Sequence, residues 1–207
     1  MSSILIRRAN MVSAGSPTPG RLPAGYTELA YLESSGTQYI YLGLTLNCGS
    51  DDSEVSFYIA NTDNNRIFGA RSSTTSRVYA LEVINGNWRL GWGSASTELA
   101  AATAGTHVAY IDHDGGVLKI DGVTVGSVGN ASTTTNYNAL LWAVRAGSNY
   151  YYGSLRVSEF KTWRNGTLRK HLVPAMRDSD SVVGMYDLVS DTFLTNAGSG
   201  TFSYGTL

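Results

Sequence analysis

The sequence predicts an all-β protein in which two antiparallel sheets pack into a β-sandwich. Three dipeptides that favour tight hairpins stand between stretches of β-type residues: Asn85–Gly86, Asp121–Gly122 and Asn165–Gly166. The 207 residues also include 23 glycines and 13 tyrosines, a composition that favours many turns and many strands. About a dozen short strands joined by such turns are typical of two packed sheets.

Alternation along two stretches supports this fold class. In EVSFYIA (54–60), Val55, Phe57 and Ile59 fall on one face of an extended strand. The stretch RVYALEVINGNWRLGW (77–92) shows the same period on both sides of its Asn-Gly turn. The apolar faces of this hairpin are then Tyr79, Leu81 and Val83 on one strand and Trp88, Leu90 and Trp92 on the other.

Shorter runs of β-type residues predict the remaining strands. They are 39–46, 66–70, 106–112, 139–145, 152–160, 182–187 and 192–195. The stretch STELAAATAG (96–105) is the best helical candidate, although it could equally form a loop with one turn of helix.

Composition argues against several classes of function. The net charge is −1 with no basic block, so we expect no nucleic-acid partner. No run approaches the roughly 18 apolar residues of a membrane helix, so we expect no membrane partner. The single cysteine, Cys48, rules out an intrachain disulfide and has no motif around it, so an inert small residue is expected.

The chain divides into two parts. Residues 1–20 end in SAGSPTPG and predict an extended N-terminal anchoring arm with a Pro/Gly linker, followed by a sandwich domain over 21–207. The apolar run of the arm precedes its arginines, which is the wrong order for a secretory signal. It suits β-augmentation or groove docking, on the chain's own domain or on another subunit. The anchoring residues are Ile4, Leu5, Ile6, Arg7 and Arg8.

Three stretches of the domain resemble a known family. They are LPAGYTELAYLESSGTQYIYLGL (22–44), GSLRVSEFKTW (153–163) and LVPAMRDSDSVVGMYDLVSDTFLTNAGSGTF (172–202). They look like the concanavalin A-like, laminin-G-like jelly-roll domains of phage and prophage structural proteins, which also occur in surface proteins of gut bacteria. The resemblance implies that the first and last strands lie side by side. It also places Tyr39, Tyr41 and Leu44 near Met185, Tyr186 and Phe193.

The same fold includes glucan hydrolases, which place two Glu and one Asp on one strand face in a Glu-x-Asp-x-(x)-Glu pattern. Serines show no G-x-S-x-G elbow either. We therefore expect no enzyme and no catalytic residue. The glutamates, none of which has the hydrolase spacing, are Glu28, Glu33, Glu54, Glu82, Glu98 and Glu159.

No metal or other cofactor is expected. In IDHDGG (111–116), Asp112 and Asp114 resemble the start of a calcium loop, but the third oxygen ligand and the final Glu are missing. A hairpin turn is the preferred interpretation, and a calcium site built from non-contiguous residues stays open. The three histidines, His107, His113 and His171, show no metal-binding spacing.

The most suggestive binding feature is AGSNYYYGSL (146–155). In an extended strand Tyr151 points opposite to Tyr150 and Tyr152, so at least one ring faces outward. Exposed rings beside Asn149 could stack on sugars, which makes these four residues the glycan-binding candidates. The alternative is that the rings pack under loops or at a subunit contact. Core or loop-packing roles are expected for Trp88, Trp92, Trp142 and Trp163.

Together these observations lead to two functional hypotheses. The first is a non-enzymatic bacteriophage virion structural protein, either a capsid decoration or head-fibre protein or a tail appendage. It would be made in the host bacterial cytoplasm and docked by its arm to capsid or tail subunits, with a homo-oligomer as one option. The alternative is a stand-alone carbohydrate-binding, lectin-like module for host or mucosal glycans.

Overall fold

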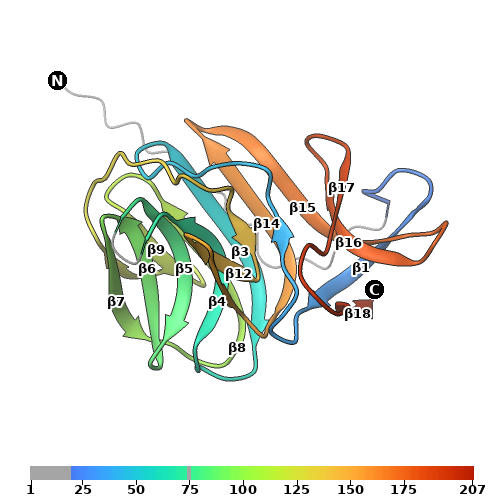
Figure 1. Ribbon diagram of the computed structural model, residues 1–207, viewed down its shortest axis with the longest axis horizontal. Coiled ribbons are helices and arrows are strands. Elements are labelled where there is room, and N and C mark those ends of the chain that lie inside the picture. Colours follow the sequence, from blue (N-terminus) through green and yellow to red (C-terminus); the bar gives the residue numbers. More distant parts are fainter. Residues whose placement is uncertain (1–19, 74–75) are drawn as a thin grey trace.

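The computed structural model describes residues 20–73 and 76–207, and in these residues the chain forms two β-sheets and no helix (Figure 1). Within the same residues, no helix has the length and apolar character needed to cross a membrane. The predicted anchoring residues Ile4, Leu5, Ile6, Arg7 and Arg8 lie outside the described residues. The two-sheet sandwich predicted from the sequence is confirmed.

The first sheet has ten strands and its pairs are antiparallel. Its last strand, β18, pairs with β1 beside the main order. In spatial order the strands are β10 (Val123–Ser127), β9 (Val117–Ile120), β8 (Gly105–Asp112), β3 (Asp51–Ile59), β14 (Arg156–Arg164), β1 (Tyr26–Glu33), β15 (Thr167–Arg177), β16 (Val182–Asp187) and β17 (Thr192–Thr195), with β18 (Ser203–Thr206).

The second sheet has eight strands, and its pairs are antiparallel except for β12 with β4. In spatial order they are β13 (Asn149–Tyr152), β12 (Ala143–Ala146), β4 (Asn65–Arg71), β5 (Val78–Ile84), β6 (Asn87–Gly93) and β7 (Ala95–Ala101), with β11 (Leu140–Leu141) joining β2 (Ile40–Tyr41) to β4. Figure 1 shows β15, β16 and β17 extending away from the part where the sheets face each other.

The core fills the space between the sheets with the residues that alternation predicts. Val55, Phe57 and Ile59 of β3 are buried. Phe57 meets Trp88 of the opposite sheet with ring centroids 6.0 Å apart, and Phe68 meets Phe160 in the same way at 5.1 Å. These edge-to-face pairs are a favoured aromatic geometry, and they hold the two sheets together.

The three predicted hairpin turns are confirmed. Asn85 and Gly86 both have positive φ, 53° and 78°, as a type I′ turn requires. In Asp121–Gly122 and Asn165–Gly166, both residues likewise have positive φ. In the first hairpin Leu81 lies opposite Leu90, so its apolar residues share one face as predicted.

The helical expectation for 96–105 is wrong. Residues Ala95–Ala101 form β7, whose Glu98 lies opposite Arg89 of β6. Leu99 packs closely over Gly126, where an added Cβ would come within 2.7 Å of its Cδ2. Hydrogen-bonded pairing with β6 and this apolar contact stabilise 95–101 as a strand, and together they outweigh the weak helix propensity of the sequence.

Trp142 interrupts the strand expected over 139–145. Its φ is 65°, which separates β11 from β12. The indole Nε1 donates a hydrogen bond to the Leu155 carbonyl oxygen at 3.0 Å, and the ring packs against Phe202 with centroids 4.6 Å apart. These buried contacts hold a backbone conformation that a bulky residue rarely adopts.

The two ends of the domain meet, as the resemblance implies. Strand β18 pairs with β1, and Glu33 lies opposite Ser203. The side-chain packing expected at this closure is found in part, because Leu44 packs on the core cluster that contains Met185, and β2 lies near β17. The expectation is wrong for the aromatic contacts. Instead of Tyr39 or Tyr41, it is Tyr26 of β1 that packs near Tyr186 and Phe193, with ring centroids 4.8 and 5.2 Å apart.

The turn after β1 explains the difference. The Gln38 side-chain oxygen accepts hydrogen bonds from the Ser34 hydroxyl at 3.0 Å and the Ser35 backbone N–H at 2.8 Å. This turn carries the chain from the first sheet to the second. Tyr39 and Tyr41 therefore lie beside β11 and β12 instead of β16.

Candidate functional site

The predicted tyrosine stretch forms β13, an edge strand of the second sheet. Strand β13 pairs with β12 through a tight turn, in which Gly147 has a φ of 64°. Tyr150 lies opposite Arg145 and Tyr152 opposite Ala143. Because side chains alternate along a strand, Tyr150 and Tyr152 project from one side and Tyr151 from the other, as the sequence predicts.

Four tyrosines gather on one side of β13, and we call them the tyrosine cluster: Tyr39, Tyr41, Tyr150 and Tyr152. The rings of Tyr150 and Tyr152 are nearly parallel, with an interplanar angle of 16° and centroids 6.4 Å apart. Tyr39 lies 5.2 Å from the Tyr150 ring and 5.4 Å from the Tyr41 ring. The cluster packs on the buried Leu140 and Ala143.

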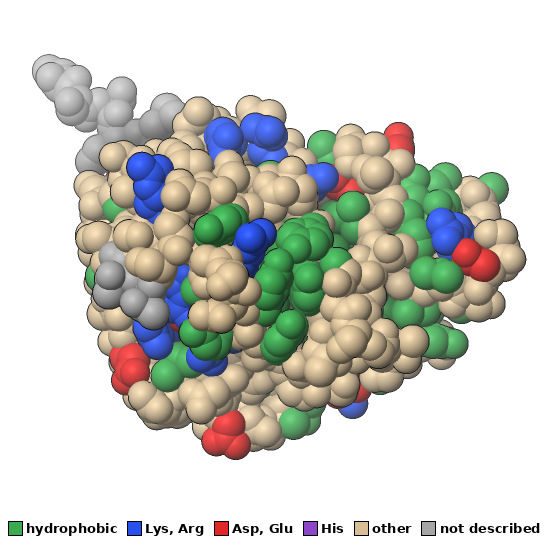
Figure 2. Space-filling model, in the orientation of Figure 1, with side chains coloured by type: hydrophobic (Ala, Val, Ile, Leu, Met, Phe, Trp, Pro, Cys, Tyr) green, Lys and Arg blue, Asp and Glu red, His purple; other side chains and the backbone are tan. Residues whose placement is uncertain are grey.

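The cluster presents both apolar and polar groups to solvent. Tyr152 is 36% exposed, Asn149 is exposed and Tyr150 is half-buried, whereas Tyr39 is buried. Figure 2 shows hydrophobic side chains gathered near the centre of one face, with Lys and Arg side chains beside them. The cluster therefore offers aromatic surface together with hydroxyl groups at one edge of the sheet, and the amide of Asn149 lies on the other side of β13.

Hydrogen bonding couples the hydroxyl groups of the cluster. The hydroxyl oxygens of Tyr41 and Tyr150 lie 2.9 Å apart. This hydrogen bond lowers the pKa of Tyr41 and raises the pKa of Tyr150. Burial, together with the hydroxyl of Tyr41, raises the pKa of Tyr39.

Arg145 adds a positive charge next to the cluster. Its guanidinium carbon lies 4.0 Å from the ring centroid of Tyr137 and 5.6 Å from that of Tyr150. Its Nε donates a hydrogen bond to the Gly147 carbonyl oxygen at 2.9 Å. The guanidinium is thus held in place by stacking and by the hairpin turn, and it provides N–H donors beside the aromatic rings.

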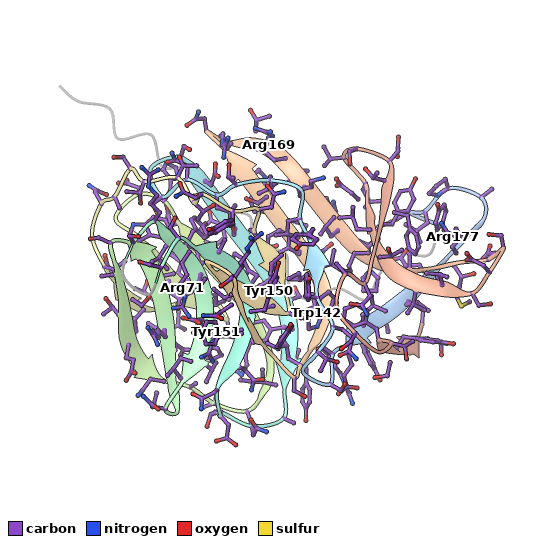
Figure 3. The ribbon with its side chains drawn as sticks, viewed as in Figure 1. Arg71, Trp142, Tyr150, Tyr151, Arg169 and Arg177 are labelled. Carbon is purple, nitrogen blue, oxygen red and sulfur yellow. The ribbon has the colours of Figure 1, made fainter. Side chains whose placement is uncertain are left out.

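Tyr151 lies on the other side of β13, against two arginines. The guanidinium carbons of Arg66 and Arg71 lie 5.7 and 5.3 Å from its ring centroid. Figure 3 shows Tyr151 and Arg71 near each other, with Tyr150 further along β13. The structure therefore brings Tyr150 and Tyr152 together on one side of β13. Asn149, which lies opposite Ala146, falls on the other side with Tyr151.

The tryptophan expectations are confirmed for three of four residues. Trp88, Trp92 and Trp142 are buried in the core. Trp163 is half-buried on β14, where its ring centroid lies 6.4 Å from that of Tyr110. It belongs neither to the core nor to a loop. After the register shift between Val157 and Glu159, Phe160 and Thr162 are the buried residues of β14, so Trp163 lies on the opposite face of the strand.

The hairpin predicted for 111–116 is confirmed, because this stretch joins β8 to β9. Asp52 of β3 joins Asp112 and His113 here, with ligand-type atoms within 4.8 Å of one another. The Asp52 Oδ1 atom accepts hydrogen bonds from the backbone N–H and the Nδ1 atom of His113, at 2.9 and 2.7 Å. The Asp112 Oδ2 atom lies 3.8 Å from Lys119 Nζ. These hydrogen bonds and this ion pair within the protein explain why Asp52, Asp112 and His113 lie close together.

Cys48 lies in the core. Burial raises the pKa of its thiol. Its Sγ accepts a hydrogen bond from the Gly93 N–H and donates one to the Val78 carbonyl, both at 3.3 Å. These properties agree with the inert role predicted for it.

Three members of the candidate site were not predicted as such: Tyr39, Tyr41 and Arg145. Tyr39 and Tyr41 flank a buried Ile40, so their spacing by two was a signal that both share a face. Arg145 had no comparable signal, because its position depends on the pairing of β12 with β13.

Comparison with known proteins supports the fold. No family model matches the sequence, and no curated protein matches it. A solved structure from Bacteroides ovatus ATCC 8483, described as a candidate carbohydrate-binding protein, superposes with a TM-score of 0.56 and 12% sequence identity. The match covers 87% of this chain and 60% of that one, so this chain spans less than two thirds of its structural neighbour.

Proposed function

We propose that this chain is a non-enzymatic, lectin-like module that binds glycans over the tyrosine cluster. The observation that carries this proposal is the nearly parallel pair of Tyr150 and Tyr152, with the Tyr152 ring partly exposed and Arg145 beside Tyr150. The rings offer apolar surface for the C–H faces of a sugar. The tyrosine hydroxyl groups and the neighbouring guanidinium of Arg145 offer hydrogen bonds to the hydroxyls of the sugar.

Two properties of the cluster suit a ligand of this kind. Tyrosine combines a large rigid ring with a polar tip, so it contacts amphipathic molecules at a low cost in side-chain entropy. The hydrogen bond between Tyr41 and Tyr150 and the packing on Leu140 hold the rings in place before a ligand arrives. A pre-ordered platform of this type reduces the entropic cost of binding.

The structural neighbour from Bacteroides ovatus supports the same class of function. It shares the sandwich over most of this chain and is described as a candidate carbohydrate-binding protein. At 12% identity the likeness establishes the fold alone, so the binding role of this chain rests on its own tyrosines. The non-enzymatic part of the proposal rests on the glutamate spacing in the sequence.

The virion structural hypothesis stays a prediction. It depends on residues 1–20 as an anchor to capsid or tail subunits, and residues 1–19 lie outside the described residues. No observation on the described strands favours a location in a virion over another. A lectin-like sandwich domain is compatible with the virion hypothesis and with the stand-alone module, because both require a domain that is accessible to glycans.

A glycan array tests the proposal. The whole chain should bind a defined set of saccharides, and Tyr150→Ala or Tyr152→Ala should reduce binding by about tenfold or more, as the loss of an aromatic contact of 1–2 kcal/mol implies. Tyr204→Ala is the matched control, because Tyr204 is 46% exposed on β18 in the other sheet. Binding to no glycan, or equal losses in the control, would overturn the proposal.

A further inference from the structure

Positive charge gathers on the side of β13 opposite to the tyrosine cluster. Arg66 of β4 and Arg89 of β6 flank Glu82 of β5 in register across three strands. The Arg66 Nε atom lies 2.7 Å from Glu82 Oε1, and Arg89 Nε lies 3.7 Å from Oε2. Arg71 adds its Nη2 atom at 3.5 Å from Oε1. Three guanidinium groups thus share one carboxylate, and we call them the arginine cluster.

One buried carboxylate forms all the ion pairs of this cluster among the described residues. Within residues 20–73 and 76–207, Glu82 is the only carboxylate in an ion pair with any of the three arginines. Glu98 lies opposite Arg89 on β7, but its oxygens accept hydrogen bonds from the side-chain amides of Asn85 and Asn87, at 3.1 and 3.4 Å. Three positive charges therefore face one buried negative charge.

Burial makes this surplus costly. Glu82 is fully buried and Arg71 is only 4% exposed. Among the described residues, the Nε atoms of the three arginines and the Oε2 atom of Glu82 are buried and form no hydrogen bond of good geometry, so the ion pairs of the cluster are imperfect. Burial lowers the pKa of Arg66, and repulsion from Arg71 and Arg89 lowers it further against the attraction of Glu82. An anion placed at the solvent-exposed part of these guanidinium groups would relieve the repulsion between them.

Tyr151 forms one wall of the arginine cluster. Its ring lies against Arg66 and Arg71, and 36% of the residue stays exposed (Figure 3). The Arg89 side chain is about a quarter exposed, at 23%, so the cluster is accessible from solvent at that end. At the other end, an incoming ligand meets the Tyr151 ring beside the Arg66 guanidinium, whose side chain is 13% exposed.

We propose that the arginine cluster is a second binding site, for the carboxylate or sulfate group of an acidic saccharide, with Tyr151 against the sugar ring. Guanidinium groups match the planar or tetrahedral oxygens of such anions and form strong charge-assisted hydrogen bonds with them. The site is separate from the tyrosine cluster and does not depend on it. An acidic polysaccharide that passes over the edge strand β13 could contact both sides of the strand.

Calorimetric titration of the whole chain tests this inference. The probes are a glucuronate oligosaccharide, a sulfated oligosaccharide, a neutral analogue and inorganic sulfate, each also titrated into Tyr150→Ala to remove binding at the tyrosine cluster. We expect at least one charged saccharide to bind more tightly than the neutral one in both proteins. Tight binding of the glucuronate oligosaccharide points to uronate carboxylates as the ligand group. Tight binding of the sulfated oligosaccharide points to sulfate esters.

Three variants of the cluster and one matched control locate the charged group. Arg66→Gln and Arg89→Gln should each weaken binding of the charged saccharide by about tenfold, the loss of one charge-assisted contact. The matched control, Arg169→Gln, removes an exposed arginine of β15 and should leave binding unchanged. Glu82→Gln should strengthen binding, because it removes the competing carboxylate.

Stability measurements separate a binding site from a purely structural ion cluster. Without ligand, Arg89→Gln should leave the midpoint of thermal unfolding unchanged or higher, because one of three like charges is removed. A clear loss of stability in that variant would indicate a structural role and contradict the proposal. So would charged saccharides that bind no more tightly than the neutral one, equal weakening in Arg169→Gln, or binding of inorganic sulfate without either saccharide.

Discussion

The hydroxyl oxygens of Tyr41 and Tyr150 lie 2.9 Å apart, although 109 residues separate them in the chain. This contact joins β2 to β13, two short strands at the margin of the second sheet. It orders the ring of Tyr150 beneath the open surface of the tyrosine cluster. The geometry of the proposed glycan site therefore depends on a long-range contact.

The first prediction concerns this hydrogen bond. Tyr41→Phe should bring the pKa of Tyr150 down toward its ordinary value, because the hydrogen bond with Tyr41 is the main cause of its rise. It should also weaken glycan binding by a few-fold while the ring packing remains. Ultraviolet titration of tyrosinate measures the first effect, with Tyr204→Phe as the control. A curve in Tyr41→Phe that differs from that of the native chain only by the loss of one tyrosine, with no shift of Tyr150, would contradict the assigned contact.

A second prediction concerns acid stability. Burial disfavours ionisation of Glu159, but hydrogen bonds from His171 and Lys161 outweigh it and lower its pKa to about 2. A carboxyl whose folded pKa is depressed stabilises the fold above its unfolded pKa, and that contribution is lost as pH falls from about 4.5 toward 2. We expect a contribution on the order of 1–2 kcal/mol at neutral pH, after allowance for partial exposure.

Denaturant unfolding of Glu159→Gln between pH 2 and 7 measures this contribution. The variant should be less stable than the native chain at pH 7 and should approach it near pH 2. Asp180→Asn is a suitable control, since Asp180 forms an exposed pair with Arg177. A constant difference between Glu159→Gln and the native chain across the pH range would contradict the prediction.

The third prediction concerns close backbone packing at Gly69. This residue has a φ of 139°, and an added Cβ would lie 2.3 Å from the Tyr79 carbonyl oxygen. Gly69→Ala should destabilise the fold by about 3 kcal/mol or more, because backbone strain and a backbone clash add together. Gly25 also has a positive φ, 91°, but no atom within 4 Å of its added Cβ.

Gly25→Ala therefore separates strain from clash and should cost only about 1 kcal/mol. The midpoint of urea unfolding measures both variants. Equal losses in the two proteins would show that the contact with Tyr79 does not constrain position 69.

A fourth prediction concerns Cys48. Its thiol is buried and its pKa is raised, so an alkylating reagent should react with it slowly in the folded chain. Reaction should become fast once the protein is unfolded in urea. Mass spectrometry follows the modification. Fast labelling under native conditions would contradict the buried position.

Local sequence patterns account for much of the fold. The Asn-Gly and Asp-Gly turns and the alternation around Phe57 and Leu81 depend on neighbouring residues, so they can be recognised directly. The strand at 95–101 could not be recognised in this way. Its stability comes from pairing with β6 and from the contact of Leu99 with Gly126, which are tertiary interactions.

The candidate site shows the same division. The alternation of Tyr150, Tyr151 and Tyr152 could be predicted, because it follows from strand geometry alone. The partners of these rings could not be predicted, because they depend on tertiary structure. Tyr39 reaches Tyr150 through the turn at 34–38, and Arg66 reaches Tyr151 through the pairing of β12 with β4. The two sides of β13 acquire different chemistry for this reason.

The central claim is that a saccharide binds over Tyr150 and Tyr152, and amide chemical-shift mapping tests it most directly. The chain is labelled with nitrogen-15 and titrated with the strongest ligand of the glycan array. The account predicts that the largest shifts lie at residues 39–41, 145 and 149–152. Shifts confined to other parts of the chain, with none at β13, would contradict it.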